Sequence, residues 1–254
     1  MNLKSLISSK ELKHSIWIIF ILTFIFAFND GKENFVFGYW LYNFFSVFIL
    51  VIITILAHMI GAKLSANFLS QEAELNVLGV KSTKFNFLWV RVEEKFEWNI
   101  FGFKIKFIPI STIVAFLLMI MSYGTIYFTA VSTIILKKVH RLRKDFEINE
   151  RKEALIYFWA LFANIILLII FNFLNIHFGV IINSYFIIWN LLPFPGFLGS
   201  KSFFNNKGLY VFFLIFVLLF LLFFAKINLI FLLILCVFVA LFVMIFWIFK
   251  IEYK

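Results

Sequence analysis

Few side chains that could bind a metal or move a proton lie in the apolar parts of this 254-residue chain. His58 lies within a long apolar run. The other three histidines lie elsewhere, two in charged segments and one at the far end of its apolar run: His14, His140 and His177. A zinc site needs several protein ligands, so one imidazole cannot form it. The sequence also has no G-x-S-x-G, no P-loop and no cluster of Cys and His, and therefore predicts no catalytic centre of these kinds.

A second feature of chemical interest is the segment NLLPFPGFLG at residues 190–199, which holds two of the three prolines, Pro193 and Pro195. Proline lacks a backbone donor and stops a helix. The carbonyl groups that it frees in an apolar region must be satisfied by buried protein groups, and Asn164 and Asn190 are candidates for this. Broken helices at membrane depth often carry ligand-binding or catalytic groups.

The composition is that of a membrane protein. Hydrophobic residues make up 64% of the chain, whereas a soluble domain averages about half, and uncharged apolar runs long enough for transmembrane helices recur. No linker divides the chain, which predicts a single membrane domain over 1–254. The lone Cys236 excludes an internal disulfide. The formal charge of +10 indicates cytoplasmic flanks attracted to anionic lipid rather than binding of nucleic acid.

The apolar runs predict an all-α polytopic membrane protein with about six transmembrane helices. Residues 15–28, preceded by lysines and followed by no cleavage site, predict an uncleaved signal-anchor helix. The other spans are expected at 38–62, 154–176, 178–192, 209–225 and 227–249. The last two form a C-terminal helical hairpin over 209–249. Between the second and third spans, residues 63–107 are rich in charge and contain alternating stretches, which predicts a cytoplasmic loop with short β-strands.

Charge bias indicates how the apolar stretch 108–136 is placed. Cytoplasmic loops carry the excess of Lys and Arg. A single crossing would put the basic loop 137–153 outside, whereas a re-entrant hairpin with its turn at SYGT, residues 122–125, keeps that loop inside. Each arm would be roughly 20 Å long as a helix, which is short for a span. We therefore expect a hairpin, with a single crossing as the alternative, and a multi-pass protein of the cell membrane with both termini cytoplasmic.

Three stretches of the chain resemble motifs of the site-2 proteases, the intramembrane zinc metalloproteases, in the order that the family has. NLLPFPGFLG resembles the family's N-x-x-P-x-P-x-x-D-G. HMIGAK, residues 58–63, resembles the H-E-x-x-H-K of archaeal members, with an Ala-Glu pair at 73–74, and ALFAN at 160–164 takes the place of G-P-x-x-N. The resemblance covers 39–205. It implies a fold that holds zinc between two histidines of one helix and an aspartate of a later, broken helix.

The chain departs from this pattern at the places that carry the chemistry. His58 stands at the first histidine place, but Met59 replaces the glutamate that accepts a proton and Ala62 replaces the second histidine. Leu198 replaces the aspartate, and residues 175–206 contain no acidic residue that could substitute for it. The remnants of the motifs are Asn164, Asn190, Pro193, Pro195 and Gly199. The resemblance therefore implies a degenerate site with no catalytic residue and no metal ligand set.

Three functions follow as hypotheses. The preferred one is a non-catalytic site-2-protease-like protein, a pseudoprotease without a cofactor, which binds a membrane segment or a partner protein in the old substrate cleft. Its expected contacts are membrane lipid and a transmembrane partner. The second is an active intramembrane metalloprotease that holds zinc with ligands outside these motifs. The third is an unrelated transporter or assembly subunit, although transport needs polar groups at mid-membrane and the spans offer little besides His58 and several asparagines.

Overall fold

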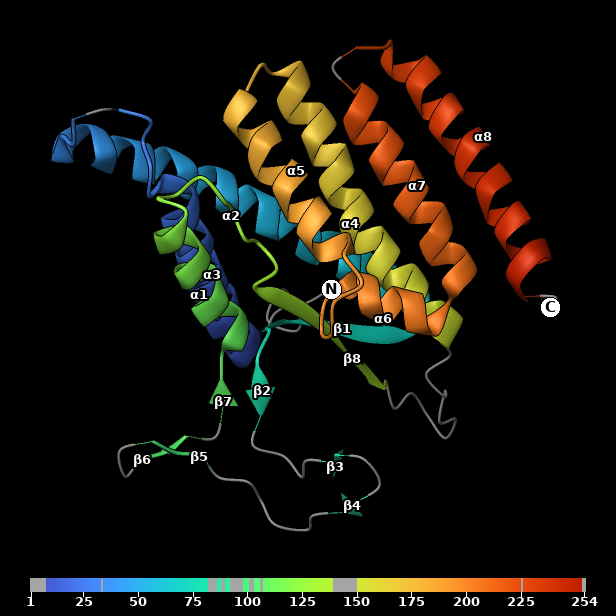
Figure 1. Cartoon of the computed structure of the whole chain (residues 1–254), viewed down its shortest axis with the longest axis horizontal. Coiled ribbons are helices and arrows are strands. Elements are labelled where there is room, and N and C mark those ends of the chain that lie inside the picture. Colours follow the sequence, from blue (N-terminus) through green and yellow to red (C-terminus); the bar gives the residue numbers. More distant parts are fainter. Residues whose placement is uncertain are drawn as a thin grey trace.

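The computed structural model describes residues 8–32, 34–81, 86–87, 90–91, 98–100, 103–105, 107–138, 150–224 and 226–252, and these are mostly helical (Figure 1). The helices are α1 (Ser9–Ala27), α2 (Phe37–Phe68), α3 (Ile110–Met121), α4 (Glu150–Phe173), α5 (His177–Leu191), α6 (Leu198–Asn205), α7 (Lys207–Phe223) and α8 (Leu229–Trp247). The strands are β1 (Gln71–Val77), β2 (Val80–Lys81), β3 (Asn86–Phe87), β4 (Val90–Arg91), β5 (Trp98–Ile100), β6 (Phe103–Ile105), β7 (Phe107–Ile108) and β8 (Ser132–Lys138). His140 lies outside the described residues, as do most of residues 82–106 of the predicted loop 63–107 and residues 139–149 of the predicted loop 137–153.

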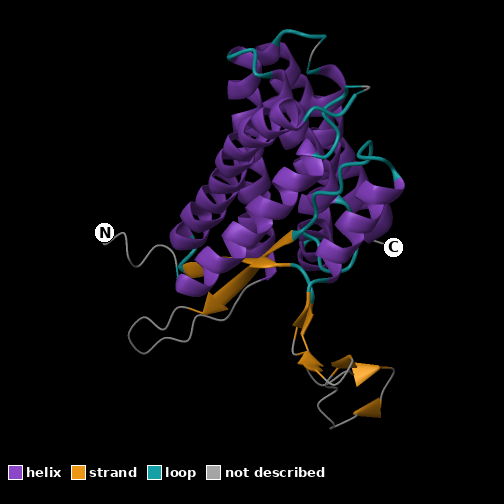
Figure 2. Ribbon diagram, turned by 90° about the vertical axis from the view of Figure 1, so that its left-hand side faces the viewer, coloured by secondary structure: helices purple, strands orange, loops and turns teal. Residues whose placement is uncertain are grey.

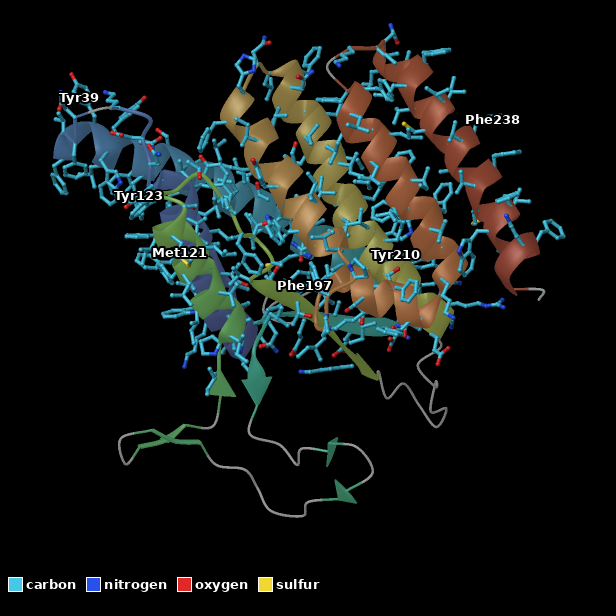
Figure 3. The ribbon with its side chains drawn as sticks, viewed as in Figure 1. Tyr39, Met121, Tyr123, Phe197, Tyr210 and Phe238 are labelled. Carbon is cyan, nitrogen blue, oxygen red and sulfur yellow. The ribbon has the colours of Figure 1, made fainter. Side chains whose placement is uncertain are left out.

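Three helices are long and apolar enough to cross a membrane: α2, α4, and α8 with its extension to Lys250. They confirm the prediction of a mainly helical membrane protein with a small β-containing part, whereas the count of six spans stays a prediction. The helices α3, α5 and α7 are apolar but shorter. On α8 only Leu232, Cys236 and Ala240 are buried, and Phe238 on its outer side is 71% exposed (Figure 3). Such an apolar face suits lipid.

The helix α2 is inclined steeply to the bundle formed by α4, α5, α7 and α8 (Figure 1). Its 32 residues correspond to a length of roughly 48 Å, more than the roughly 30 Å of a bilayer's hydrocarbon core. A helix of this length must tilt or extend beyond the core. Exposed aromatic side chains of the kind found at membrane interfaces cluster at its N-terminal end: Phe35, Phe37, Tyr39 and Tyr42.

The stretch 108–136 turns back where the sequence predicts. The helix α3 ends at Met121, and Tyr123 and Gly124 adopt positive φ values of 51° and 75° in the turn. Asn29, just beyond α1, donates from Nδ2 to the Tyr123 carbonyl at 3.1 Å, so the turn reaches the depth at which α1 ends. The return arm is extended rather than helical and continues into β8, a strand that the sequence analysis did not predict. Its β-branched sequence favours a strand.

The strands β1 and β8 pair antiparallel, with Leu75 opposite Ile134. A charged side chain contacts each outer edge at this level. The Glu11 carboxylate, which is 2% exposed, accepts from the Leu75 N–H at 3.1 Å and pairs with Lys63 at 2.8 Å. On the other edge Lys201 donates to the Ile134 carbonyl at 2.8 Å. The sheet lies beneath the helices (Figure 2) and ties α1, α2 and α6 together at one end of the bundle.

This end also holds the described end of α8, because Ile248 lies near Gly208 at the beginning of α7. One end of the bundle thus holds the sheet, α6, the first described residues of α1 and the last described residues after α8.

We expect cysteines placed at Lys81 and Arg141 in a Cys236→Ala background to be labelled by an impermeant reagent from the same side. A cysteine at Asp30, between α1 and α2, is the control and should be labelled from the opposite side. Labelling of Lys81 and Arg141 from opposite sides would show that 108–136 crosses once.

Candidate functional site

A buried polar network joins α2, α4 and α5 at the level of the motif positions. His58 Nδ1 lies 3.0 Å from Asn164 Oδ1 and 3.1 Å from the Ala160 carbonyl oxygen. Asn164 Nδ2 donates to the Thr54 carbonyl and to Asn183 Oδ1, both at 3.1 Å. Asn183 Nδ2 donates in turn to Thr54 Oγ1 at 3.1 Å. All four polar side chains are fully buried. The network therefore links three helices through hydrogen bonds within the protein.

The network fixes the tautomer of His58. The two groups that face Nδ1 are oxygen atoms, and a backbone carbonyl can only accept. The orientation of the Asn164 amide is set by its donation to the Thr54 carbonyl, which leaves Oδ1 toward His58. Nδ1 therefore carries the proton, and the lone pair lies on Nε2. Nε2 has no hydrogen-bond partner among the described residues.

A close crossing of α2 and α4 brings these groups together. A Cβ on Gly61 would lie 2.7 Å from both the Trp159 carbonyl oxygen and Ala163 Cβ, so only glycine allows this approach. Close approach through small residues is the usual way in which membrane helices pack. Asn164, predicted as a motif remnant, lies at this crossing and binds His58. Asn183 and Thr54 belong to the same network, but the sequence analysis did not single them out because isolated polar residues in apolar runs form no motif.

The proline segment ends α5 as predicted and turns into α6. Pro193 and Pro195 are exposed, Gly196 has a φ of +91°, and α6 begins at Leu198. The carbonyl of Leu191 accepts from the Tyr210 hydroxyl at 3.2 Å (Figure 3). The carbonyl of Gly196 accepts from Thr133.

The freed carbonyls of this segment are thus not bound by Asn164 and Asn190, the candidates from the sequence. Asn164 binds α2 instead, and Asn190 donates to the Phe186 carbonyl of its own helix at 2.9 Å. The hydroxyl groups of Tyr210 and Thr133 donate to carbonyls of this segment instead. Both lie outside the motifs, on α7 and β8, so only the tertiary fold reveals them.

Gly199 lies against the end of α5. A Cβ at this position would stand 2.0 Å from the Leu191 carbonyl oxygen and 2.7 Å from that of Leu192. His58, in turn, contacts Phe186 of α5 edge to face, with ring centroids 5.0 Å apart. The helix α5 therefore contacts both His58 and the beginning of α6, where Leu198 stands at the aspartate position of the resembled motif.

The residues at the zinc-binding places do not fit a zinc ion. Met59 turns toward α1, where its sulfur lies 3.5 Å from the Ser15 hydroxyl oxygen. Ala62 and Leu198 are buried and have no ligand atom. Across the described ranges no group of three or more His, Cys, Asp or Glu side chains could hold a metal ion. His177 is exposed at the other end of α5. His58 would be a single ligand, and one imidazole does not hold a zinc ion.

Comparison of the chain with protein-family models, curated proteins and solved structures finds no match. Family membership therefore remains a proposal that rests on the motifs and on this geometry.

Lys201 of α6 is a partly buried cation that the motifs did not indicate. Its Nζ donates to Thr133 Oγ1 at 2.7 Å and to the Ile134 carbonyl, which fastens α6 to β8. Burial lowers the pKa of Lys201 to about 8, and the nearby Glu153 carboxylate acts in the opposite direction. Because Gly196 also binds Thr133, the lysine and the proline segment meet at the same threonine.

An apolar groove of about 670 Å³ runs between α2 and α4. From α2 it is lined by Ile60, Leu64 and Phe68, and from α4 by Trp159, Ile166 and Ile170. These six side chains are 46–88% exposed, and Phe68 is the most exposed of them. The region around His58 is closed by comparison, since His58, Asn190 and Leu198 are all fully buried. None of these three side chains lines the groove, so the groove is a surface separate from the buried motif positions.

Proposed function

We propose that this protein is a non-catalytic, site-2-protease-like integral membrane protein of the cell membrane, multi-pass, with both termini in the cytoplasm. The observation that carries the proposal is the bonding of Asn164. Its amide oxygen accepts from His58 and its amide nitrogen donates to Thr54 and Asn183, so the polar side chains beside the first histidine place of the motif hold helices together. Met59 and Ala62 supply neither a base nor a second ligand.

The proposed activity is binding of a membrane segment or a partner protein. Its support is the groove between α2 and α4, which is apolar, exposed and formed by the two helices that carry the first two motifs. A whole helix, about 10–12 Å in diameter with its side chains, is too large to enter a space of this size. The large side chains of a partner helix laid along the groove would fit, as in other helix-in-groove contacts.

Site-specific photo-crosslinking tests this activity in native membranes. A benzophenone amino acid in place of Trp159, which lines the groove, is expected to give a discrete protein adduct. The matched control is the same group in place of Phe238 on the outer side of α8, where we expect no such adduct. Filling the groove with Ile166→Trp, at an exposed lining position, should reduce the adduct at least about tenfold, a loss of about 1.4 kcal/mol in binding. Equal adducts at both positions, or no effect of filling, would reject the groove as the binding surface.

A further inference from the structure

The apolar groove between α2 and α4 ends beside a lysine. Its α4 wall includes Leu155, Trp159 and Ile166, whose spacing puts them on one face of the helix. Lys152 precedes Leu155 by three residues and Trp159 by seven, and α4 is already helical from Glu150, so Lys152 lies on the same face. The groove face of α4 is therefore apolar along its length and carries a positive charge at its beginning.

The lysine marks the end of the groove that lies nearest the sheet. Thr54 of α2 accepts from Asn164 of α4, and Gly61, about two turns later on α2, lies against Trp159, which comes earlier on α4. The two helices therefore run antiparallel, so the end of α2 at Phe68 and the beginning of α4 share one end of the groove. In the proposed topology this is the cytoplasmic end, where a membrane helix leaves the hydrocarbon core.

The carboxylates closest to Lys152 in the described elements face other ways. Glu153 accepts a hydrogen bond from α6, so it faces that helix. Glu150 precedes Lys152 by two residues, which places it on roughly the opposite side of α4. Glu72, which follows α2 on β1, stands opposite Lys137 in the sheet. None of these three carboxylates lies on the groove face of α4.

We propose that the partner in the groove is a transmembrane helix with an acidic residue where it leaves the membrane, and that this carboxylate pairs with Lys152; the proposal deepens the proposed function and rests on it. Most membrane helices carry Lys or Arg at their cytoplasmic ends, and Lys152 would repel these. The apolar walls alone accept any large apolar side chain, so the charge at the end of the groove is what discriminates between helices.

Charge reversal tests the acidic partner separately from the groove. With the benzophenone group at position 159, Lys152→Glu should reduce the protein adduct roughly threefold to tenfold, since it removes an ion pair and adds a repulsion. Lys207→Glu, at the exposed beginning of α7, is the matched control and should leave the yield unchanged. A full yield in Lys152→Glu would overturn the acidic partner while the groove stands. A lipid adduct in place of a protein adduct would overturn it too, and no adduct in the parent protein would reject the proposed function itself.

Model helices supply defined partners for the same groove. Three tagged single-span helices, which differ only in a Glu, Gln or Lys at the cytoplasmic border, are co-expressed with the benzophenone variant. We expect the Glu helix to give the most adduct and the Lys helix the least, and Lys152→Glu should reverse this order. Equal yields for the three helices would contradict the pairing with Lys152, because binding would then depend on the apolar walls alone.

Discussion

Gly199→Ala is expected to prevent this protein from reaching its folded state in useful amounts. The added Cβ would stand 2.0 Å from the Leu191 carbonyl oxygen and 2.4 Å from the Leu191 carbonyl carbon, and backbone atoms cannot move away as a side chain can. Overpacking of this kind costs up to about 3 kcal/mol and occasionally more. We expect a loss of at least that size, visible as a Tm lowered by roughly 6–12 °C or as loss of monodisperse protein after detergent extraction.

Gly208→Ala is the matched control, because Gly208 also stands near the beginning of a helix. A Cβ there would meet Ile248 Cδ1 at 3.4 Å, an ordinary contact, and nothing closer. The change should leave Tm unaltered or raise it slightly, since alanine favours the helix. Equal Tm values for the two variants would contradict the close packing of α6 against the end of α5.

Asn164→Leu is the second change with a large expected effect. It removes the amide from the crossing of three helices and leaves the Thr54 carbonyl and Asn183 Oδ1 without their donor. Hydrogen bonds between membrane helices average about 0.6 kcal/mol, and an unpaired buried group costs about 1–3 kcal/mol. We expect a loss of about 2–4 kcal/mol, measured as unfolding in mixed micelles.

Asn172→Leu provides the comparison on the same helix, because Asn172 is exposed and lies outside the network. It should be neutral within about 0.5 kcal/mol, as surface substitutions usually are. An Asn164→Leu protein as stable as Asn172→Leu would mean that the network is not what joins α2, α4 and α5.

The positions of the helices could be predicted from hydrophobic runs, because apolar length is the dominant signal in a membrane protein. The predicted span 38–62 lies within α2, and 178–192 matches α5. The first helix begins earlier than the predicted 15–28, because the charged residues before it are helical and Glu11 is buried against β1. The strand β8 was missed because residues 132–136 read equally well as an apolar arm, and only pairing with β1 decides between the two.

The candidate site was predictable only where a motif names its residues. Asn164 and Gly199, which the motifs name, both lie at contacts between helices, although Asn164 bonds Thr54 and Asn183 and not the carbonyls expected for it. The orientation of Met59 toward Ser15 could not be predicted, because a helix of nearly uniform apolarity does not reveal which face meets which neighbour. The contacts of Lys201 with Thr133 and Ile134 join segments 67 and 68 residues apart, and no local pattern encodes such a pairing.

The central claim is a protease-like fold without its metal, and the zinc content of purified protein tests it most directly. Metal analysis should find far less than about one zinc per chain in the natural sequence. A Met59→Glu, Ala62→His, Leu198→Asp variant should bind zinc weakly and lose it on dialysis, because groups that orient the ligands are missing. Its expression should fall, since each unpaired charge costs about 2.5–3.5 kcal/mol at mid-membrane. About one tightly held zinc per chain of the natural sequence would contradict the account.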